Sequence, residues 1–149
     1  MPLIFRTMRH DDDGPLLGAE EDMLGATNRD VSVGEDGAVG PGRGISVAPE
    51  WRKLPPSRIP ARLRDPWAPK ARGGLDRCIW QLGEGAFLAS EVAPGLRLVV
   101  TDPKRHGEVA PAELILLDAY QGHLAATKPK WSLIPEEKER GARQADGRK

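Results

Sequence analysis

Glycine and proline place the strongest constraint on what this 149-residue chain can fold into. The sequence contains 17 glycines and 14 prolines, spread over most of its length. Both residues interrupt regular structure, proline by removing a backbone donor and glycine by its conformational freedom. The length suits one hydrophobic core rather than two. We therefore predict a single domain over residues 1–135, built from short elements joined by many loops.

Short apolar runs predict about six strands. In the clearest run, Leu96, Leu98 and Val100 alternate with Arg97 and Val99, which is the period of a half-buried strand. Other runs have similar lengths and are bounded by glycine, proline or aspartate. The predicted strands are 3–8, 45–48, 77–82, 96–101 and 106–110, with 131–134 as a further edge strand.

One long helix is predicted near the C-terminus, over residues 112–126. Leu117, Tyr120 and Leu124 fall on one helical face, and Pro111 suits a first helical turn. A shorter helix is predicted over 16–24. The fold class expected from these elements is α+β, with a small, strongly bent, split β-sheet and one long C-terminal helix.

The remaining segments read as loops and a tail. Residues 25–43 are rich in glycine and aspartate, and long loops of this kind tend to be functional or mobile. The prolines of residues 54–60 exclude a helix there, and 62–74 reads as a surface loop. Residues 136–149 are highly charged with few apolar side chains, so we predict a disordered tail.

The charges balance overall but not locally. The chain has 22 basic and 22 acidic residues, so no global basic field attracts nucleic acid, and nucleic acid is not an expected partner. Residues 1–50 hold ten acids against four arginines, whereas residues 51–80 hold eight basic residues against two aspartates. This asymmetry has two interpretations: a self-complementary surface, or a basic rim that attracts a phosphate-bearing ligand.

Cysteine and leader patterns point to a reducing compartment. Cys78 is the one cysteine, lies in an apolar run and reads as a small buried hydrophobe, so neither a disulfide nor a cysteine metal site is expected. His10 stands beside three aspartates without a fixed ligand spacing, and we predict no metal. Residues 1–8 lack the pattern of a signal peptide, and no apolar run reaches membrane-spanning length. We therefore expect a cytoplasmic protein.

Two candidate binding elements lie in the first third of the chain. Arg6 stands within an apolar strand, where its planar fork of donors would grip a phosphate or ribose, or would simply reach the surface. Gly44, Ile45 and Ser46 open the second strand. Gly44 permits close approach of a ligand to backbone amides, and Ser46 adds a hydroxyl. Ordinary turn and strand chemistry is the alternative interpretation of these three residues.

A third candidate element is the strand of His106 and Glu108. Two residues apart in a strand, both side chains point to the same face. One interpretation is a surface salt bridge with Arg105. The other is contact with a ligand sugar, where a carboxylate stabilises oxocarbenium character as a glycosidic bond breaks.

Five motifs of the chain belong together: Arg6 in the first strand, Gly44-x-Ser46-Val47, Val92-Ala93-Pro94-Gly95-Leu96, His106-Gly107-x-Val109-x-Pro111 and Leu117-Asp118-Ala119-Tyr120. Taken together, these motifs resemble the mono-ADP-ribosyltransferase fold, and most closely its bacterial effector toxins delivered by type VI secretion. In the Arg-Ser-Glu transferases, the position two residues before the glutamate is usually Glu or Gln, whereas here it is His106.

The resemblance implies an NAD-binding cleft in a bacterial toxin that acts inside a cell, reached by export without a signal peptide. Arg6 would hold phosphate or ribose, Gly44, Ile45 and Ser46 would form the nicotinamide side, and His106 or Glu108 would face the reactive ribose. The toxin would transfer ADP-ribose to a macromolecular target or hydrolyse NAD, and an immunity protein would be its partner. The alternative is a non-enzymatic module of the same fold that docks an acidic partner through its basic, proline-rich segment.

Overall fold

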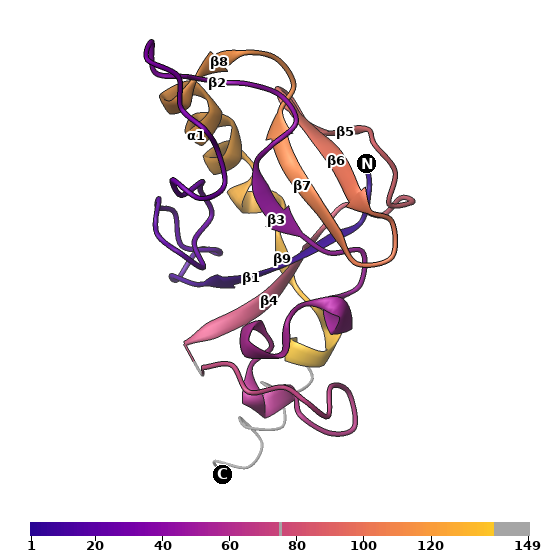
Figure 1. The fold of residues 1–149 in the computed structure, drawn as a ribbon. Helices are drawn as coiled ribbons and strands as arrows, with labels where there is room; N and C mark the ends of the chain where they lie inside the picture. The colour runs from indigo at the N-terminus through magenta and orange to yellow at the C-terminus, as the bar shows by residue number, and fades with distance from the viewer. Residues whose placement is uncertain (75, 139–149) are drawn as a thin grey trace.

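The computed structural model describes residues 1–74 and 76–138, and its strands form separate antiparallel sheets (Figure 1). The largest sheet has four strands in the order β3-β7-β6-β5. Central β7 pairs with β3 on one side and with β6 on the other. The bounds are β3 Ile45–Val47, β5 Glu91–Ala93, β6 Leu96–Asp102 and β7 His106–Pro111. Each of these strands overlaps a predicted apolar run except β5.

A second sheet crosses the lower part of the domain in the order β1-β4-β9. Its strands are β1 Ile4–Arg9, β4 Arg77–Leu82 and β9 Ser132–Leu133. Phe5 and Ala48 join this sheet to the end of β3, because each donates its amide to the other's carbonyl at 2.9 Å. The α+β class with a split sheet is therefore confirmed, and one α-helix of three turns accompanies it.

The C-terminal helix starts later than the sequence predicts. Helix α1 is Leu117–Ala126, and residues before it form β8, Ile115–Leu116, which pairs with β2, Ala38–Val39. Pro111 ends β7 instead of entering a helix. The predicted start at 112 is wrong because the partner strand lies about 75 residues earlier, which a helical period cannot reveal.

The short helix predicted over 16–24 is also wrong. This segment folds back on β1: Leu16 donates to Arg9 O at 2.8 Å, and Arg9 donates to Asp22 O at 2.6 Å. Asp22 has φ = 63°, a left-handed conformation that ends any helical run. Backbone groups that a helix would pair internally therefore pair with a strand. We call residues 18–24 the acidic loop.

Single 3₁₀ turns lie in and beside residues 54–60, the proline-rich range for which the sequence excluded a helix, and the second of them falls within it. The turns are η1 Trp51–Lys53, η2 Pro56–Arg58 and η3 Ala61–Leu63, and a fourth, η4 Lys128–Lys130, follows α1. Pro56 occupies the first position of η2, where the missing amide hydrogen is not needed. The prediction was correct for an α-helix and missed these shorter turns.

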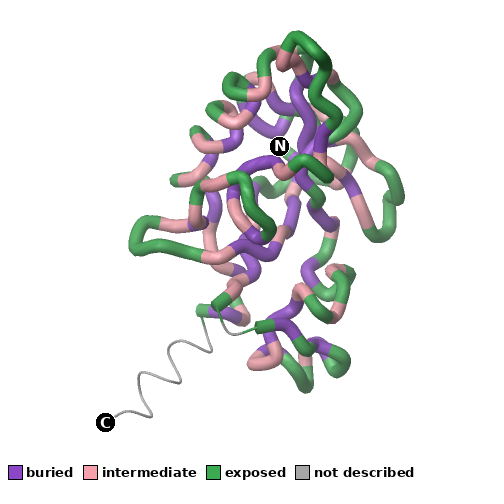
Figure 2. Tube along the Cα trace, turned by 60° about the vertical axis from the view of Figure 1, so that its left-hand side comes forward, coloured by how far each residue is buried: buried purple, intermediate pink, exposed green. Residues whose placement is uncertain are grey.

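Hydrophobic side chains cover both faces of the β1–β4 pair, which explains the nearly continuous apolar sequence of β1. Ile4 and Met8 pack with Tyr120 and Leu124 of α1 in the larger core cluster. The opposite face packs in a smaller cluster beneath the 3₁₀ turns: Phe5, Trp51, Ile59, Leu63, Ala68, Ala71, Ile79 and Ile134. Figure 2 shows buried segments in the interior of the molecule and exposed segments in the parts of the chain around its edge.

The first residues of the predicted tail are packed. Residues 135–138 form a helical turn in which Glu137 is buried and pairs with Arg62, Oε2 to Nη2, at 2.6 Å. Glu136 lies 3.9 Å from Arg52. The prediction of disorder from residue 136 onward is therefore wrong for residues 136–138, because Glu137 and Glu136 pair with arginines of the fold. The rest of that prediction, 139–149, lies outside the described residues.

Candidate functional site

One cavity brings three predicted site residues together. It has a volume of about 840 Å³ and lies between β1, β3, the start of β7 and the acidic loop. Arg6, Ser46 and His106 all line it, although they come from three different strands. These three residues therefore lie at one cavity of the structure. The cavity's basic lining residues are Arg6, Arg29, Lys53, Arg58, Arg105 and His106.

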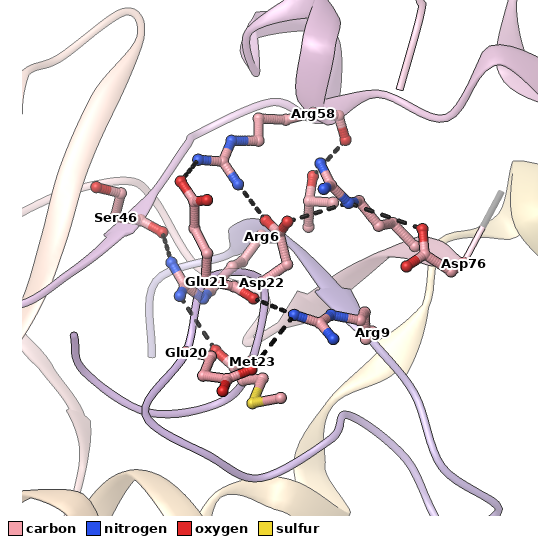
Figure 3. A network of polar contacts seen from close by, with 11 residues as sticks. Arg6, Arg9, Glu20, Glu21, Asp22, Met23, Ser46, Arg58 and Asp76 are labelled. Carbon is pink, nitrogen blue, oxygen red and sulfur yellow. Dashed lines mark hydrogen bonds and ion pairs between the residues drawn. The ribbon is translucent and has the colours of Figure 1, made fainter. Parts of the chain in front are cut away.

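The Arg6 guanidinium joins two backbone segments by hydrogen bonds. Its Nη1 donates to Ser46 O at 2.8 Å and its Nη2 donates to Met23 O at 3.1 Å (Figure 3). The Nε is buried and has no hydrogen-bond partner in the part of the chain that the structure describes. Burial lowers the pKa of Arg6, an effect that Asp30 and Asp22 oppose. The two terminal nitrogens of Arg6, which were predicted to hold phosphate, thus already donate to two backbone carbonyls.

Ser46 owes its position to the alternation of β3. Ile45 and Val47 are buried, while Ser46 between them is exposed and lines the cavity. A strand places successive side chains on opposite faces, so the two apolar neighbours fix the orientation of the serine.

Gly44 and Ile45 do not line this cavity. Gly44 donates its amide to Glu108 Oε1 at 3.1 Å, and Ile45 donates its amide to Tyr120 Oη at 3.2 Å. Their amides are therefore not offered to a ligand as the sequence suggested. A Cβ on Gly44 would lie 1.9 Å from Val109 O, so glycine is needed for the close approach of the chain to β7.

Tyr120 holds the same junction from the helix side. Its hydroxyl is buried, accepts from the Ile45 amide and donates to Val109 O at 2.6 Å. Burial raises the pKa of Tyr120, and the Ile45 hydrogen bond opposes that rise. The sequence analysis placed Tyr120 on the apolar face of the helix but predicted no hydrogen bond for its hydroxyl. The only available signal was a hydroxyl on an otherwise apolar stripe.

His106 and Glu108 make different contacts in the structure. His106 lines the cavity, and its Nδ1 lies 2.5 Å from Thr101 Oγ1. Glu108 instead accepts the Gly44 amide and is not among the lining residues. Of the two alternatives that the sequence left open, His106 is therefore the side chain at the cavity wall.

A network of arginines surrounds Glu21 and Asp22 of the acidic loop (Figure 3). Asp22 is 4% exposed and pairs with Arg58, and its Oδ2 lies 3.0 Å from Arg77 Nε. Arg58 also pairs with Glu21, and Thr7 Oγ1 donates to Arg58 O at 2.7 Å. Sequence reasoning missed this network, although the local excess of acids in 1–50 and of bases in 51–80 was its signal.

Arg58 and Glu21 stabilise each other's charged forms. Burial disfavours the Arg58 charge, but hydrogen bonding to Glu21 and the charge of Asp22 outweigh burial and raise its pKa. The hydrogen bond from Arg58 lowers the pKa of Glu21. Arg29, Lys53 and Arg105 line the same cavity and form no ion pair with the described residues.

Several arginines of the proline-rich segment are engaged within the chain. Arg52 lies near Glu136, Arg62 pairs with Glu137, and Arg64 Nε donates to Ala71 O at 2.9 Å. Trp51 is buried beneath Arg52, whose guanidinium lies 4.8 Å from the ring centroid. This segment therefore completes the fold and contributes Lys53, Leu54, Pro55 and Arg58 to the cavity wall.

Within residues 1–74 and 76–138, no group of three or more His, Cys, Asp or Glu side chains is arranged to hold a metal ion. Among the helices of that same part of the chain, none combines the length and apolar character needed to cross a membrane.

Comparison with known proteins gave no relative. No protein-family profile matches the sequence, no curated protein matches it, and no solved structure matches the fold.

Proposed function

We propose that the cavity binds NAD and that the protein is a bacterial effector toxin of the mono-ADP-ribosyltransferase type. The observation that supports this most directly is the meeting of Arg6, Ser46 and His106 at one cavity. Its volume of about 840 Å³ lies within the range of roughly 300–1,000 Å³ usual for ligand pockets. Basic side chains on the wall suit the negative diphosphate of NAD.

Each residue has a task in this proposal. Ser46 and His106 face the ribose and nicotinamide, with Ser46 presented by the alternation of β3. Arg6 fixes the relative positions of Met23 and Ser46 through their carbonyls. Glu108 and Tyr120 set the path of the backbone at Gly44 and Ile45 and contact no ligand. These contacts pre-organise the Ser46 strand, which reduces the ordering cost of binding.

NAD supplies the reactive bond, between nicotinamide and ribose. Its cleavage releases nicotinamide and delivers ADP-ribose to a nucleophile of a macromolecule or to water. The proposed setting is the cytoplasm of a target cell, and an immunity protein that covers the cavity is the proposed partner. The protein-binding alternative gains no support from the proline-rich segment, because Arg52, Arg58 and Arg62 already pair with acids of the same chain.

The test is incubation of the protein with labelled NAD and bacterial lysate. Nicotinamide release is measured separately from transfer of label to protein or nucleic acid. Ser46→Ala and His106→Ala should reduce both signals, and both variants should relieve growth arrest on expression. Ser90→Ala and His123→Ala change the same residue types outside the cavity lining and should match the wild type. A folded wild-type protein that neither consumes NAD nor slows growth would contradict the proposal.

A further inference from the structure

We propose that Arg58 is the phosphate-binding residue of the cavity, and that Glu21 occupies it until the diphosphate of a ligand displaces the Glu21 carboxylate. This inference rests on the proposed function, because it assigns the anion-binding part of the same cavity. It moves the phosphate contact from Arg6, where the sequence placed it, to a residue in the second 3₁₀ turn.

Arg6 is poorly suited to hold a phosphate. Both of its terminal nitrogens donate to carbonyls, at 2.8 and 3.1 Å, and these bonds tie β1 to β3 and to the acidic loop. A ligand phosphate that took either nitrogen would leave a carbonyl without its partner. The Nε that remains is buried, so it presents one donor and no fork.

Arg58 offers what Arg6 lacks. Its side chain lines the cavity, is 32% exposed, and already places its guanidinium against two carboxylates. A planar guanidinium that binds carboxylate also suits phosphate oxygens. Lys53, on the preceding 3₁₀ turn, lines the same cavity and has no ion-pair partner in the described part of the chain. It adds a second positive charge for an anion.

The two carboxylates on Arg58 differ in how firmly they are held. Asp22 is buried, is also paired with Arg77, and accepts the Arg9 amide at its carbonyl. The Glu21 side chain is 59% exposed, and Arg58 is the one partner of its carboxylate in the described residues. A largely exposed ion pair contributes little to stability, so Glu21 is the group that a ligand can replace. Asp22 then keeps Arg58 in place.

The experiment measures pyrophosphate binding by calorimetry at constant ionic strength. Glu21→Gln removes the competing charge and should tighten binding by about threefold to tenfold, the effect of releasing a weak ion pair. Glu20→Gln is the matched control, because it removes the same charge from a lining residue 3.9 Å from Arg9 and not on Arg58. The control should change binding by less than about twofold. Thermal melts establish that each variant is folded.

Arg58→Lys tests the phosphate contact itself. It keeps a charge beside buried Asp22 but loses the fork, so pyrophosphate binding should weaken by about tenfold. If Glu21→Gln and Glu20→Gln tightened pyrophosphate binding equally, the effect would be one of net charge alone, and the inference would be overturned. Absence of pyrophosphate binding to folded Glu21→Gln protein would also overturn it.

Parallel titrations with NAD separate this inference from the proposed function. NAD binding that is unaffected by both Glu21→Gln and Arg58→Lys would overturn the inference and leave the function standing. Pyrophosphate binding that responds as expected, without NAD binding or nicotinamide release, would support the Arg58 assignment and contradict the NAD function.

Discussion

At the scale of single residues, Gly44 lies where the start of β3 passes closest to β7. The amide of Gly44 meets Glu108, the amide of Ile45 meets Tyr120, and Tyr120 in turn meets Val109 O. The sequence marked Gly44 and Glu108 as ligand contacts, and the structure uses them to join strands. The resemblance implied that Arg6, Ser46 and His106 share one cleft, but the sequence could not show which hydrogen-bond donors the fold itself uses.

Gly44→Ala should destabilise the protein. The added Cβ would lie 1.9 Å from Val109 O and 2.6 Å from Tyr120 Oη, so strands must shift, at a cost of about 1–3 kcal/mol. Gly122→Ala is the matched control. It lies in α1 with no atom within 4 Å of the added Cβ, and should stabilise the helix by about 0.5–1 kcal/mol. Urea denaturation measures both, and equal stability of the Gly44 variant and the wild type would contradict the close contact.

Cys78 should react slowly with thiol reagents in the folded protein. Burial, followed by the charge of Glu137, raises the pKa of Cys78 to about 11, so the thiol stays protonated at pH 8. Disulfide-exchange labelling at pH 8 should be slow in buffer and fast in concentrated urea, where the thiol regains an ordinary pKa of about 8.5. Equal labelling rates in the two conditions would show that Cys78 is neither buried nor perturbed.

At the scale of elements, strands with long apolar runs could be predicted from the sequence, whereas the two-residue strands that pair with each other could not. Apolar runs located β1, β3, β4, β6 and β7 because each of these strands has one or both faces in a core. Strands β2 and β8 are two residues long, and β8 was absorbed into the predicted helix. The acidic loop was mistaken for a helix because its backbone partners lie on β1 rather than four residues away. Neither the pairing of β2 with β8 nor that of the acidic loop with β1 can be predicted from the local sequence.

Glu137→Gln should lower stability through the turn at 135–138. The side chain is 4% exposed, and its pairing with Arg62 at 2.6 Å is a hydrogen bond between charged groups, worth about 1.5–3 kcal/mol. Glu136→Gln is the neighbouring control, since its partner Arg52 is 52% exposed and lies 3.9 Å away, and should cost less than about 1 kcal/mol. Denaturation midpoints that fall equally for both variants, or for neither, would contradict the buried pairing.

At the scale of the whole molecule, two sheets and a helix meet around a cavity whose wall carries both signs of charge. The α+β class was predictable from the apolar runs and from the glycines and prolines between them. The cavity was not, because its wall combines β1 and β3 with segments near residues 20, 30, 55 and 105 that only tertiary packing brings together. The uneven charge distribution supports the interpretation of a self-complementary surface, since acids of the first third pair with arginines of the middle third.

Stability should fall on acidification below about pH 4.5. Hydrogen bonding to Arg58 lowers the pKa of Glu21 from 4.5, and hydrogen bonding to Lys128 lowers the pKa of Asp11 from 3.8. The folded state thus binds fewer protons than the unfolded state in this range, so these groups stabilise the fold above their ordinary pKa values and lose that effect as pH falls. Urea midpoints at pH 6 and pH 3.5 measure it. A higher midpoint at pH 3.5 would contradict this sign.

The most direct test of the NAD-binding cavity is calorimetric titration of NAD into the wild type and into Ser46→Tyr. Ser46 is exposed on a strand and lines the cavity, so a tyrosine there should fold normally and fill the space beside His106. Ser90→Tyr is the control outside the lining residues. We expect one NAD per wild-type or Ser90→Tyr molecule, and binding at least about tenfold weaker in Ser46→Tyr, the loss of roughly 1.4 kcal/mol. NAD affinity that is equal in all three folded proteins, or absent from the wild type, would contradict the assignment of this cavity.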